Sequence, residues 1–267
     1  NPFHGGYTIF TGLEELIDKL ESLSFSEEDI EYLRNLGMFD DKFLAYLSNY
    51  RFEGNLYAFE EGTPAFPGEP LMRIETNLID AQLIESLLLN TVNFQTLVAT
   101  KASRMSIATN GQGLIMEFGL RRAQGEDGAH SASRASYVGG TAITSNTYAG
   151  KKYNIPVSGT MAHSWIMSFD SEEDAFRKFS EIYPDNCILL IDTFDTLGSG
   201  IEAAIKIGLE MKEKGKKIGV RIDSGDLSYL SKKIRKKLDD AGLYDATICV
   251  SNDLTEEIIL NLVNDGA

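Results

Sequence analysis

The segment R-I-D-S-G-D at 221–226 places charged side chains inside and directly after an apolar strand pattern. In the expected strand 217–222 the isoleucines and the valine share one face, whereas Arg221 and Asp223 share the other. A charge inside a strand is costly unless it is paired or bound to a ligand. We therefore interpret Arg221 and Asp223 as site residues. A purely structural ion pair between them remains the alternative.

Two further polar segments carry groups that can do chemistry. In S-G-T-M-A-H-S at 158–164, His163 follows an expected strand among small hydroxyl residues, where a histidine can act as a base, a nucleophile or a phosphoryl acceptor. No cysteine or serine and aspartate lie at a spacing that indicates a protease or esterase triad. In I-D-T-F-D at 191–195, Asp192 can bind sugar hydroxyls or a metal, although helix capping also explains such residues.

The segment E-F-G-L-R-R at 117–122 combines an aromatic ring with two adjacent arginines. Arg121 can hold a phosphate or a carboxylate, and Phe118 can stack on a planar ligand. Solvated arginines and a core phenylalanine are the alternative. Asn252 lies in another polar strand end, S-N-D at 251–253, and completes the candidate substrate-binding residues.

The elements that position these residues alternate between strand and helix patterns. The expected strands are 114–118, 156–161, 187–192, 217–222 and 247–251. The expected helices are 129–148, 171–182, 197–214, 226–241 and 254–264. Ser171, Gly215 and Gly242 mark helix ends. Successive β-α units predict a parallel sheet, and polar residues at every strand end favour a barrel over an open sheet.

The N-terminal part differs in character. Residues 11–50 show helical spacing, with a capping box at Thr11 and Glu14 and further helix starts at Ser26 and Asp40. Short strands with Gly/Pro turns are expected in 51–76, and a long helix in 78–109. We interpret His130, in a segment rich in small residues, as structural. The sequence thus predicts an N-terminal domain at 1–110 and a partial α/β barrel with the site at 111–267.

Composition limits the function classes. The chain of 267 residues has 25 Lys+Arg and 40 Asp+Glu, a net charge of −15, which argues against a nucleic-acid surface. Two cysteines exclude a disulfide scaffold and indicate buried thiols in a reducing compartment. No run is long and apolar enough for a membrane span, and no signal peptide is present. We expect a cytoplasmic protein. The ends, Asn1-Pro2-Phe3 and Asp265-Gly266-Ala267, suggest the middle of a longer chain.

Five motifs together resemble the nicotinate phosphoribosyltransferase family. They are N-P-F-H-G-G-Y at 1–7, E-F-G-L-R-R-A-Q at 117–124, S-G-T-M-A-H-S at 158–164, I-D-T-F-D at 191–195 and R-I-D-S-G-D at 221–226. The resemblance implies a type II phosphoribosyltransferase-like irregular α/β barrel with a discontinuous, smaller N-terminal α/β domain. It also implies the reaction of nicotinate with phosphoribosyl pyrophosphate, coupled to ATP hydrolysis through a phosphohistidine.

The resemblance assigns roles to individual residues. His163 would take the phosphoryl group, Thr160 and Arg221 would lie at nicotinate, and Asp192 and Asp223 would lie near ribose or pyrophosphate. Phe118 would stack on the pyridine ring, and Arg121 would face the phosphoribosyl phosphate. ATP with magnesium would be the co-substrate, with no prosthetic group, and the protein ligands of the metal stay open.

The resemblance also implies a homodimer. A family tyrosine upstream of Asn1 and a glycine-rich phosphate loop after Ala267 are not in this sequence, so the chain by itself is expected to be inactive. The alternatives are an enzyme for nicotinamide or quinolinate, or an inactive relative that acts as a binding protein. The stretch Gly139-Gly140-Thr141-Ala142 lacks an acidic residue to accept an amide N–H, which favours the acid substrate.

Overall fold

The computed structural model describes residues 5–267, so His4 and the start of the 1–7 motif lie outside the described residues. The chain divides into two compact units. The first comprises Asn1–Arg104 and Ile115–Val157, and the second comprises Met105–Leu114 and Ser158–Ala267. Within residues 5–267, no helix is both long and apolar enough to cross a lipid bilayer.

The N-terminal part of the first unit is mainly helical, and the sequence predicted the starts of two of its helices correctly. The helices are α1 Leu13–Ser22, α2 Glu27–Asn35, α3 Asp41–Ser48 and α4 Leu78–Ala108, of which α4 continues into the second unit. Ser26 caps α2 and Asp40 caps α3, as predicted. The capping box at Thr11 and Glu14 is wrong. The Glu61 carboxylate instead accepts the N–H groups of Gly12 at 2.5 Å and Leu13 at 2.7 Å, so a distant acid replaces the local cap.

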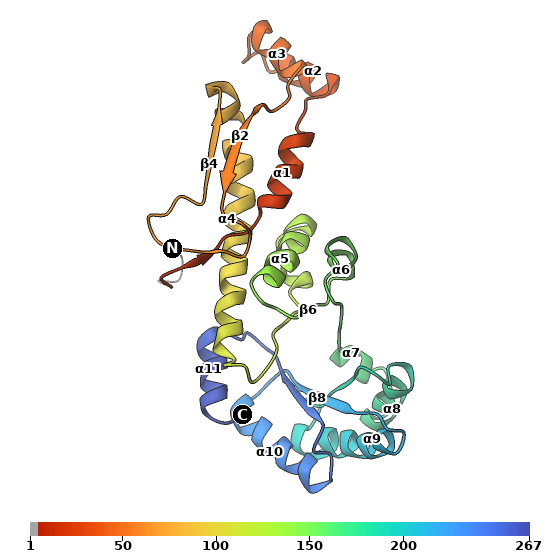
Figure 1. The fold of residues 1–267 in the computed structure, drawn as a ribbon. Helices are drawn as coiled ribbons and strands as arrows, with labels where there is room; N and C mark the ends of the chain where they lie inside the picture. The colour runs from red at the N-terminus through yellow and green to blue at the C-terminus, as the bar shows by residue number, and fades with distance from the viewer. Residues whose placement is uncertain (1–4) are drawn as a thin grey trace. The chain divides into compact units, whose positions relative to one another are not determined.

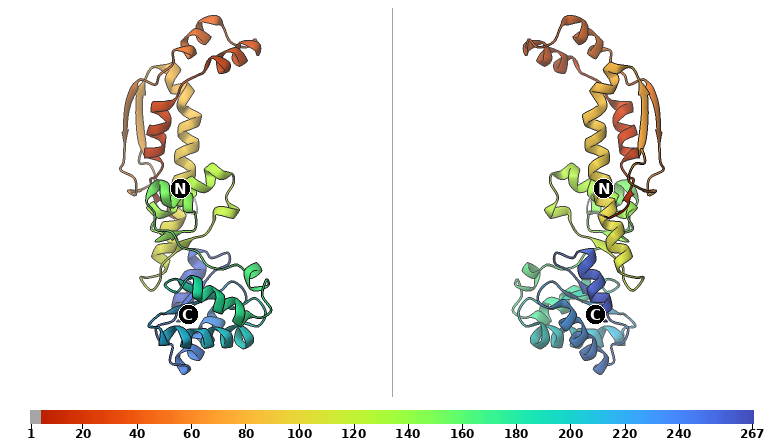
Figure 2. Two further views of the ribbon diagram at one scale, coloured as in Figure 1. Left: turned by 90° about the vertical axis from the view of Figure 1, so that its right-hand side faces the viewer. Right: turned by 90° about the vertical axis from the view of Figure 1, so that its left-hand side faces the viewer.

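Short antiparallel strands complete the N-terminal part, as predicted. The first unit contains β1 Thr8–Ile9, β2 Gly54–Ala58, β3 Pro64–Ala65, β4 Met72–Thr76, β5 Met116–Glu117 and β6 Ile143–Thr144. β1 pairs with β3 and β2 with β4, both antiparallel, while β5 and β6 are parallel. β2 and β4 lie beside α1 and α4 (Figures 1 and 2), and apolar side chains of all four form one core.

Residues 115–157 differ from the expected pattern. The expected helix 129–148 is two helices, α5 Glu126–Val138 and α6 Thr147–Tyr153, with β6 between them. The break follows α5 at Gly140, whose φ of 106° suits glycine. The buried guanidinium of Arg134 on α5 pairs with Glu14 and Glu61, and this contact ties α5 to the N-terminal helices. The compact unit that contains α5 is formed by two separate stretches of the chain. The domain boundary at residue 110 stays a prediction.

The second unit contains a three-stranded parallel sheet with helices before, between and after its strands. The strands β7 Cys187–Leu190, β8 Ile218–Ile222 and β9 Thr247–Val250 lie in the order β7-β8-β9. The helices are α7 His163–Ile166, α8 Glu172–Ile182, α9 Ile201–Glu213, α10 Leu227–Asp240 and α11 Glu256–Asn264. Ser171 caps α8, and Gly215 and Gly242 follow α9 and α10 with φ of 71° and 77°, as predicted.

The expected strand 156–161 is not formed. Only an isolated bridge between Thr144 and Val157 remains of it. Pro156 has no N–H to donate to a ladder, although its carbonyl accepts the N–H of Thr144 at 3.0 Å. Residues 158–162 are instead irregular and lead into α7, which His163 begins.

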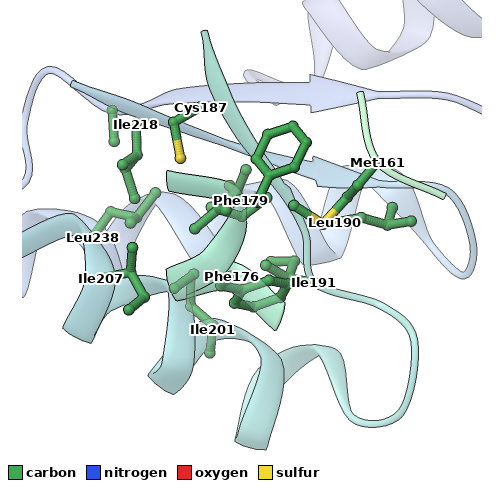
Figure 3. Close-up of a cluster of buried hydrophobic side chains, with 14 of the residues drawn as sticks. Met161, Phe176, Phe179, Cys187, Leu190, Ile191, Ile201, Ile207, Ile218 and Leu238 are labelled. Carbon is green, nitrogen blue, oxygen red and sulfur yellow. The ribbon is translucent and has the colours of Figure 1, made fainter. Parts of the chain in front are cut away.

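The predicted alternation of β8 is confirmed by the core of the second unit. Ile218, Val220 and Ile222 are buried with side chains of β7, α8, α9 and α10. Figure 3 shows labelled members of this cluster, including Phe176 of α8 and Ile207 of α9, gathered beside the strands. Because one face of β8 is fully used by this core, its other face is available for Arg221.

Candidate active site

Polar side chains meet at the carboxyl ends of the three parallel strands of the second unit. Asp192 lies two residues after β7, Asp223 follows β8 and Ser251 follows β9. Parallel pairing continues just beyond the strands, because Ile191 N–H donates to the carbonyl of Arg221 at 3.1 Å and Ser251 N–H donates to that of Ile222 at 2.9 Å. The backbone thus brings these side chains to one sheet edge, as predicted for neighbouring parallel strands.

The side chain of Arg221 is the centre of the cluster and is only 13% exposed. Its Nε donates to Ser251 Oγ at 2.9 Å, and its Nη1 donates to Thr160 Oγ1 at 2.8 Å. Its Nη2 donates to Asp223 Oδ1 at 2.9 Å. The ion pair that was considered as an alternative is therefore present, and it is part of a larger polar cluster.

His163 lies against both carboxylates of the cluster. Its Nδ1 is 3.1 Å from Thr193 Oγ1. Its Nε2 lies 3.6 Å from Asp223 Oδ2 and 4.0 Å from Asp192 Oδ1, and the side chain is 39% exposed. Both ring nitrogens of His163 therefore face oxygen atoms of the cluster.

The two carboxylates differ in their surroundings. The Asp192 side chain is fully buried, and its Oδ2 accepts the N–H of Asp223 at 2.8 Å and the hydroxyl of Ser224 at 2.5 Å. Its Oδ1 is buried without a hydrogen-bond partner and lies 4.0 Å from Nε2 of His163. An acceptor left in this state is suited to a positive or hydrogen-donating neighbour.

The electrostatics of Asp223 favour the ionised form. Burial raises the pKa of this carboxyl, but hydrogen bonds from Ser251 and Arg221 and the charges of Arg221 and His163 outweigh it, so the pKa is lower than usual. The Ser251 hydroxyl donates to Asp223 Oδ1 at 2.6 Å. Asp223 is therefore a carboxylate throughout the neutral pH range.

The structure brings together most of the predicted residues. Those in the cluster are His163, Thr160, Arg221, Asp192 and Asp223. Asn252 directly follows the cluster residue Ser251; it is exposed and has a φ of 97°, and its role stays a prediction. Sequence reasoning did not single out Thr193, Ser224 and Ser251, although each lies in a polar strand end that it identified.

Phe118 and Arg121 belong to the first unit, so their roles stay predictions. Both lie on the turn after β5, where Arg121 is exposed in the short 3₁₀ helix Leu120–Arg122 and Phe118 is half-buried. Glu117 supports this turn. Its carboxylate accepts the N–H of Gly119, and it also accepts hydroxyls of Ser133 at 3.0 Å and Thr144 at 2.6 Å.

The cluster offers two carboxylates for a cation. Among residues 5–267, no group of three or more His, Cys, Asp or Glu side chains is placed to hold a metal ion. Magnesium commonly binds through one or two carboxylates together with substrate phosphates. Asp192 and Asp223 are therefore the side chains of this cluster that would contact a magnesium ion bound to a phosphate-bearing substrate.

Family models match both parts of the chain. The model of the nicotinate phosphoribosyltransferase (NAPRTase) N-terminal domain matches residues 1–93, and that of the NAPRTase family matches residues 114–265. Nicotinate phosphoribosyltransferase of Bacillus subtilis is 47% identical over 266 residues, which are 100% of this chain and 54% of that protein. The enzyme of that name from Mycobacterium tuberculosis is 42% identical over 257 residues, 96% of this chain and 55% of the relative.

Solved structures agree with these matches. Human nicotinic acid phosphoribosyltransferase superposes with a TM-score of 0.90 at 30% identity, over 99% of this chain and 64% of that chain. Nicotinate-nucleotide pyrophosphorylase from Pyrococcus furiosus gives a TM-score of 0.79 at 24% identity, over 98% of this chain and 60% of that chain, and this likeness concerns the fold. The predicted type II phosphoribosyltransferase-like α/β class is confirmed. The chain spans about half the length of the curated relatives it matches.

A second buried acid lies close to the site in sequence. Asp195 caps the π-helical turn Thr196–Gly200, which follows the polar end of β7. Glu172 of α8 is 5% exposed, and its Oε2 accepts the hydroxyl of Ser199 in this turn at 2.5 Å, whereas its Oε1 is buried without a partner. Burial raises the pKa of Glu172, and the negative charge of Asp195 raises it further. The hydrogen bond from Ser199 lowers the pKa but does not outweigh these two effects.

Because the Glu172 carboxyl is buried and has a raised pKa, we predict that Glu172→Gln increases the thermal stability of the protein in a pH-dependent way. Because the folded-state pKa is raised, ionising Glu172 costs stability as pH rises through that pKa. Glutamine keeps an acceptor for Ser199 without the charge. We expect a higher Tm than wild type at pH 7 to 8, with the difference shrinking towards pH 4, measured by scanning calorimetry across this range.

The neighbouring Glu173→Gln is the matched control with the opposite sign. Hydrogen bonds from Lys206 and Arg177 lower the pKa of Glu173, so its contribution is present at neutral pH and is lost in acid. This variant should be less stable than wild type at pH 7 and should approach it as the pH falls. Equal pH dependence in the two variants would contradict the assignment of Glu172 as a buried, destabilised carboxylate.

Proposed function

Because the chain belongs to the nicotinate phosphoribosyltransferase family, we propose that the protein transfers the phosphoribosyl group of phosphoribosyl pyrophosphate to nicotinate. The products are nicotinate mononucleotide and pyrophosphate, and ATP hydrolysis is coupled to the transfer. The observation that carries the proposal is the polar cluster in which Arg221 is hydrogen-bonded to Thr160 and Asp223, while His163 Nε2 lies 3.6 Å from the Asp223 carboxylate. It combines a cation for an anionic substrate with an imidazole held by carboxylates.

Arg221 and Thr160 form the proposed nicotinate contact. Four hydrogen bonds engage the guanidinium, and they run to Ser251, Thr160, Met161 and Asp223. A guanidinium has five N–H donors, so one on Nη2 remains for the substrate carboxylate. Since Thr160 Oγ1 accepts from Arg221, the threonine can donate its own hydrogen to that carboxylate. A charge-assisted contact of this kind favours the acid over the amide.

His163 is the proposed phosphoryl acceptor. The lone pair on Nδ1 attacks the γ-phosphorus of ATP, an N–P bond forms, and the bond to the bridging oxygen breaks as ADP leaves with that electron pair. Asp223 and Asp192 hold the proton on Nε2 and stabilise the charge that develops on the ring. Magnesium bound to the ATP phosphates would offset their charge, and water later cleaves the N–P bond to release phosphate.

The remaining roles follow from the resemblance. Phe118 stacks on the pyridine ring, Arg121 binds the phosphoribosyl phosphate, and both aspartates contact ribose or pyrophosphate. Asn252 is proposed as a further substrate-binding residue. We also propose a homodimer, which sedimentation velocity at micromolar concentration tests, and a cytoplasmic location. The free thiols of Cys187 and Cys249 support a reducing compartment. An assay of mononucleotide formation by the full-length protein, with nicotinate, nicotinamide or quinolinate as the substrate, distinguishes the alternative enzymes. Binding of nicotinate without product formation would indicate an inactive relative.

Arg221→Ala should impair nicotinate use far more than folding. Loss of a charge-assisted hydrogen bond corresponds to a fall of about 10- to 150-fold in affinity. Steady-state kinetics of the full-length protein measure KM for nicotinate. The control is Arg177→Ala, which removes ion pairs to Glu173 and Glu210 on α8 and α9 and should keep the wild-type KM. An unchanged KM in Arg221→Ala would exclude this residue from the nicotinate site.

His163→Asn should abolish stimulation by ATP and leave only slow, ATP-independent transfer. The full-length protein is incubated with ATP labelled on the γ-phosphate, and the acid lability of the bound label is measured, since phosphohistidine is labile in acid. Wild type and the control His130→Asn should carry acid-labile label, and His163→Asn should carry none. Label that persists in His163→Asn, or that disappears in His130→Asn, contradicts the assignment.

A further inference from the structure

The hydroxyl of Ser251 lies between the two charged groups of the cluster. Its oxygen accepts from Arg221 Nε at 2.9 Å and its hydrogen is directed at Asp223 Oδ1, 2.6 Å away. The carbonyl of Ile222 is a longer and weaker acceptor at 3.3 Å. A serine hydroxyl has one hydrogen and two lone pairs, so it can satisfy both partners at once.

The place of Ser251 is set by the sheet and not by its own side chain. Its N–H donates to the Ile222 carbonyl at 2.9 Å, which continues the pairing of β8 with β9. In that register Cys249 lies opposite Arg221. The serine backbone is therefore held while its side chain reaches across to the neighbouring strand end, and replacing the hydroxyl leaves this backbone pairing intact.

Ser251 differs from the other hydroxyl groups of the cluster in contacting both charges. Thr160 contacts Arg221, Thr193 contacts His163 and Ser224 contacts Asp192. Without Ser251, the Nε donor of a nearly buried guanidinium and one oxygen of Asp223 would each lose a partner. The remaining contacts of Arg221, on Nη1 and Nη2, allow the guanidinium to tilt.

We propose that Ser251 is a positioning residue that holds Arg221 and Asp223 in the orientation required for nicotinate binding. This inference rests on the proposed function. Through Arg221 the hydroxyl keeps Nη1 on Thr160 at 2.8 Å, and this fixes the guanidinium whose remaining Nη2 donor is proposed to bind the substrate carboxylate. Through Asp223 it keeps Oδ2 facing His163 Nε2 at 3.6 Å. One neutral group thus links the nicotinate contact to the phosphoryl acceptor.

The test compares Ser251→Ala, Ser251→Thr and Ser228→Ala in the full-length protein. Ser228 of α10 donates to Asp265 outside the cluster and is the matched control for loss of one serine hydroxyl. In Ser251→Ala we expect KM for nicotinate to rise about 10-fold or more while kcat changes less, because ground-state positioning is lost. Ser251→Thr retains the hydroxyl and should return KM to near the wild-type value.

Two readouts separate positioning from a general loss of packing. Lost positioning should raise KM for nicotinate without an equal fall in kcat, and the hydroxyl of Ser251→Thr should restore KM, whereas a packing defect predicts neither result. An unchanged KM in Ser251→Ala, an equal rise in Ser228→Ala, or no recovery in Ser251→Thr would overturn the inference. Wild-type protein that forms no nicotinate mononucleotide would instead overturn the proposed function, and this inference with it.

Discussion

The guanidinium of Arg221 is largely shielded from water. The polar cluster forms around it because a buried positive charge needs a negative partner and hydrogen-bond acceptors. A buried charge is tolerated only when its donors are satisfied by an opposite charge and by hydrogen bonds. Asp223 supplies the charge, and Thr160 and Ser251 supply two of the acceptors. Asp223, paired with Arg221 through Oδ1, has its Oδ2 3.6 Å from Nε2 of His163.

The hydrophobic core of the second unit fixes the strand register on which the polar cluster depends. Ile218, Val220 and Ile222 are buried on one side of β8, so the strand cannot slip by one residue without exposing them and burying Arg221 in the core. Hydrophobic packing therefore sets the register, and the register sets which strand-end residues face one another. The chemistry of the site is in this sense a consequence of the apolar face of the sheet.

The first unit solves a similar problem with different residues. Arg134 is buried on α5, and Glu14 and Glu61 meet its charge. Glu61 also accepts the N–H groups at the start of α1, which is why a predicted local cap was not used. In the same unit, the Glu117 carboxylate accepts hydrogen bonds from two hydroxyl groups and from the N–H of Gly119. This one carboxylate therefore stabilises the turn that carries Phe118 and Arg121.

The sequence by itself determined the β-α alternation, most helix ends of the second unit, the two faces of β8 and the residue types at the strand ends, because these depend on local periodicity and capping. It failed at 156–161, where only an isolated bridge at Val157 forms, and at 129–148, where the first helix ends at Val138 before Gly139-Gly140. Only the tertiary structure decided that Thr160 meets Arg221 across 61 positions and that Ser251 meets Asp223 across 28. Such contacts depend on strand register and on the balancing of buried charge, which local sequence patterns do not encode.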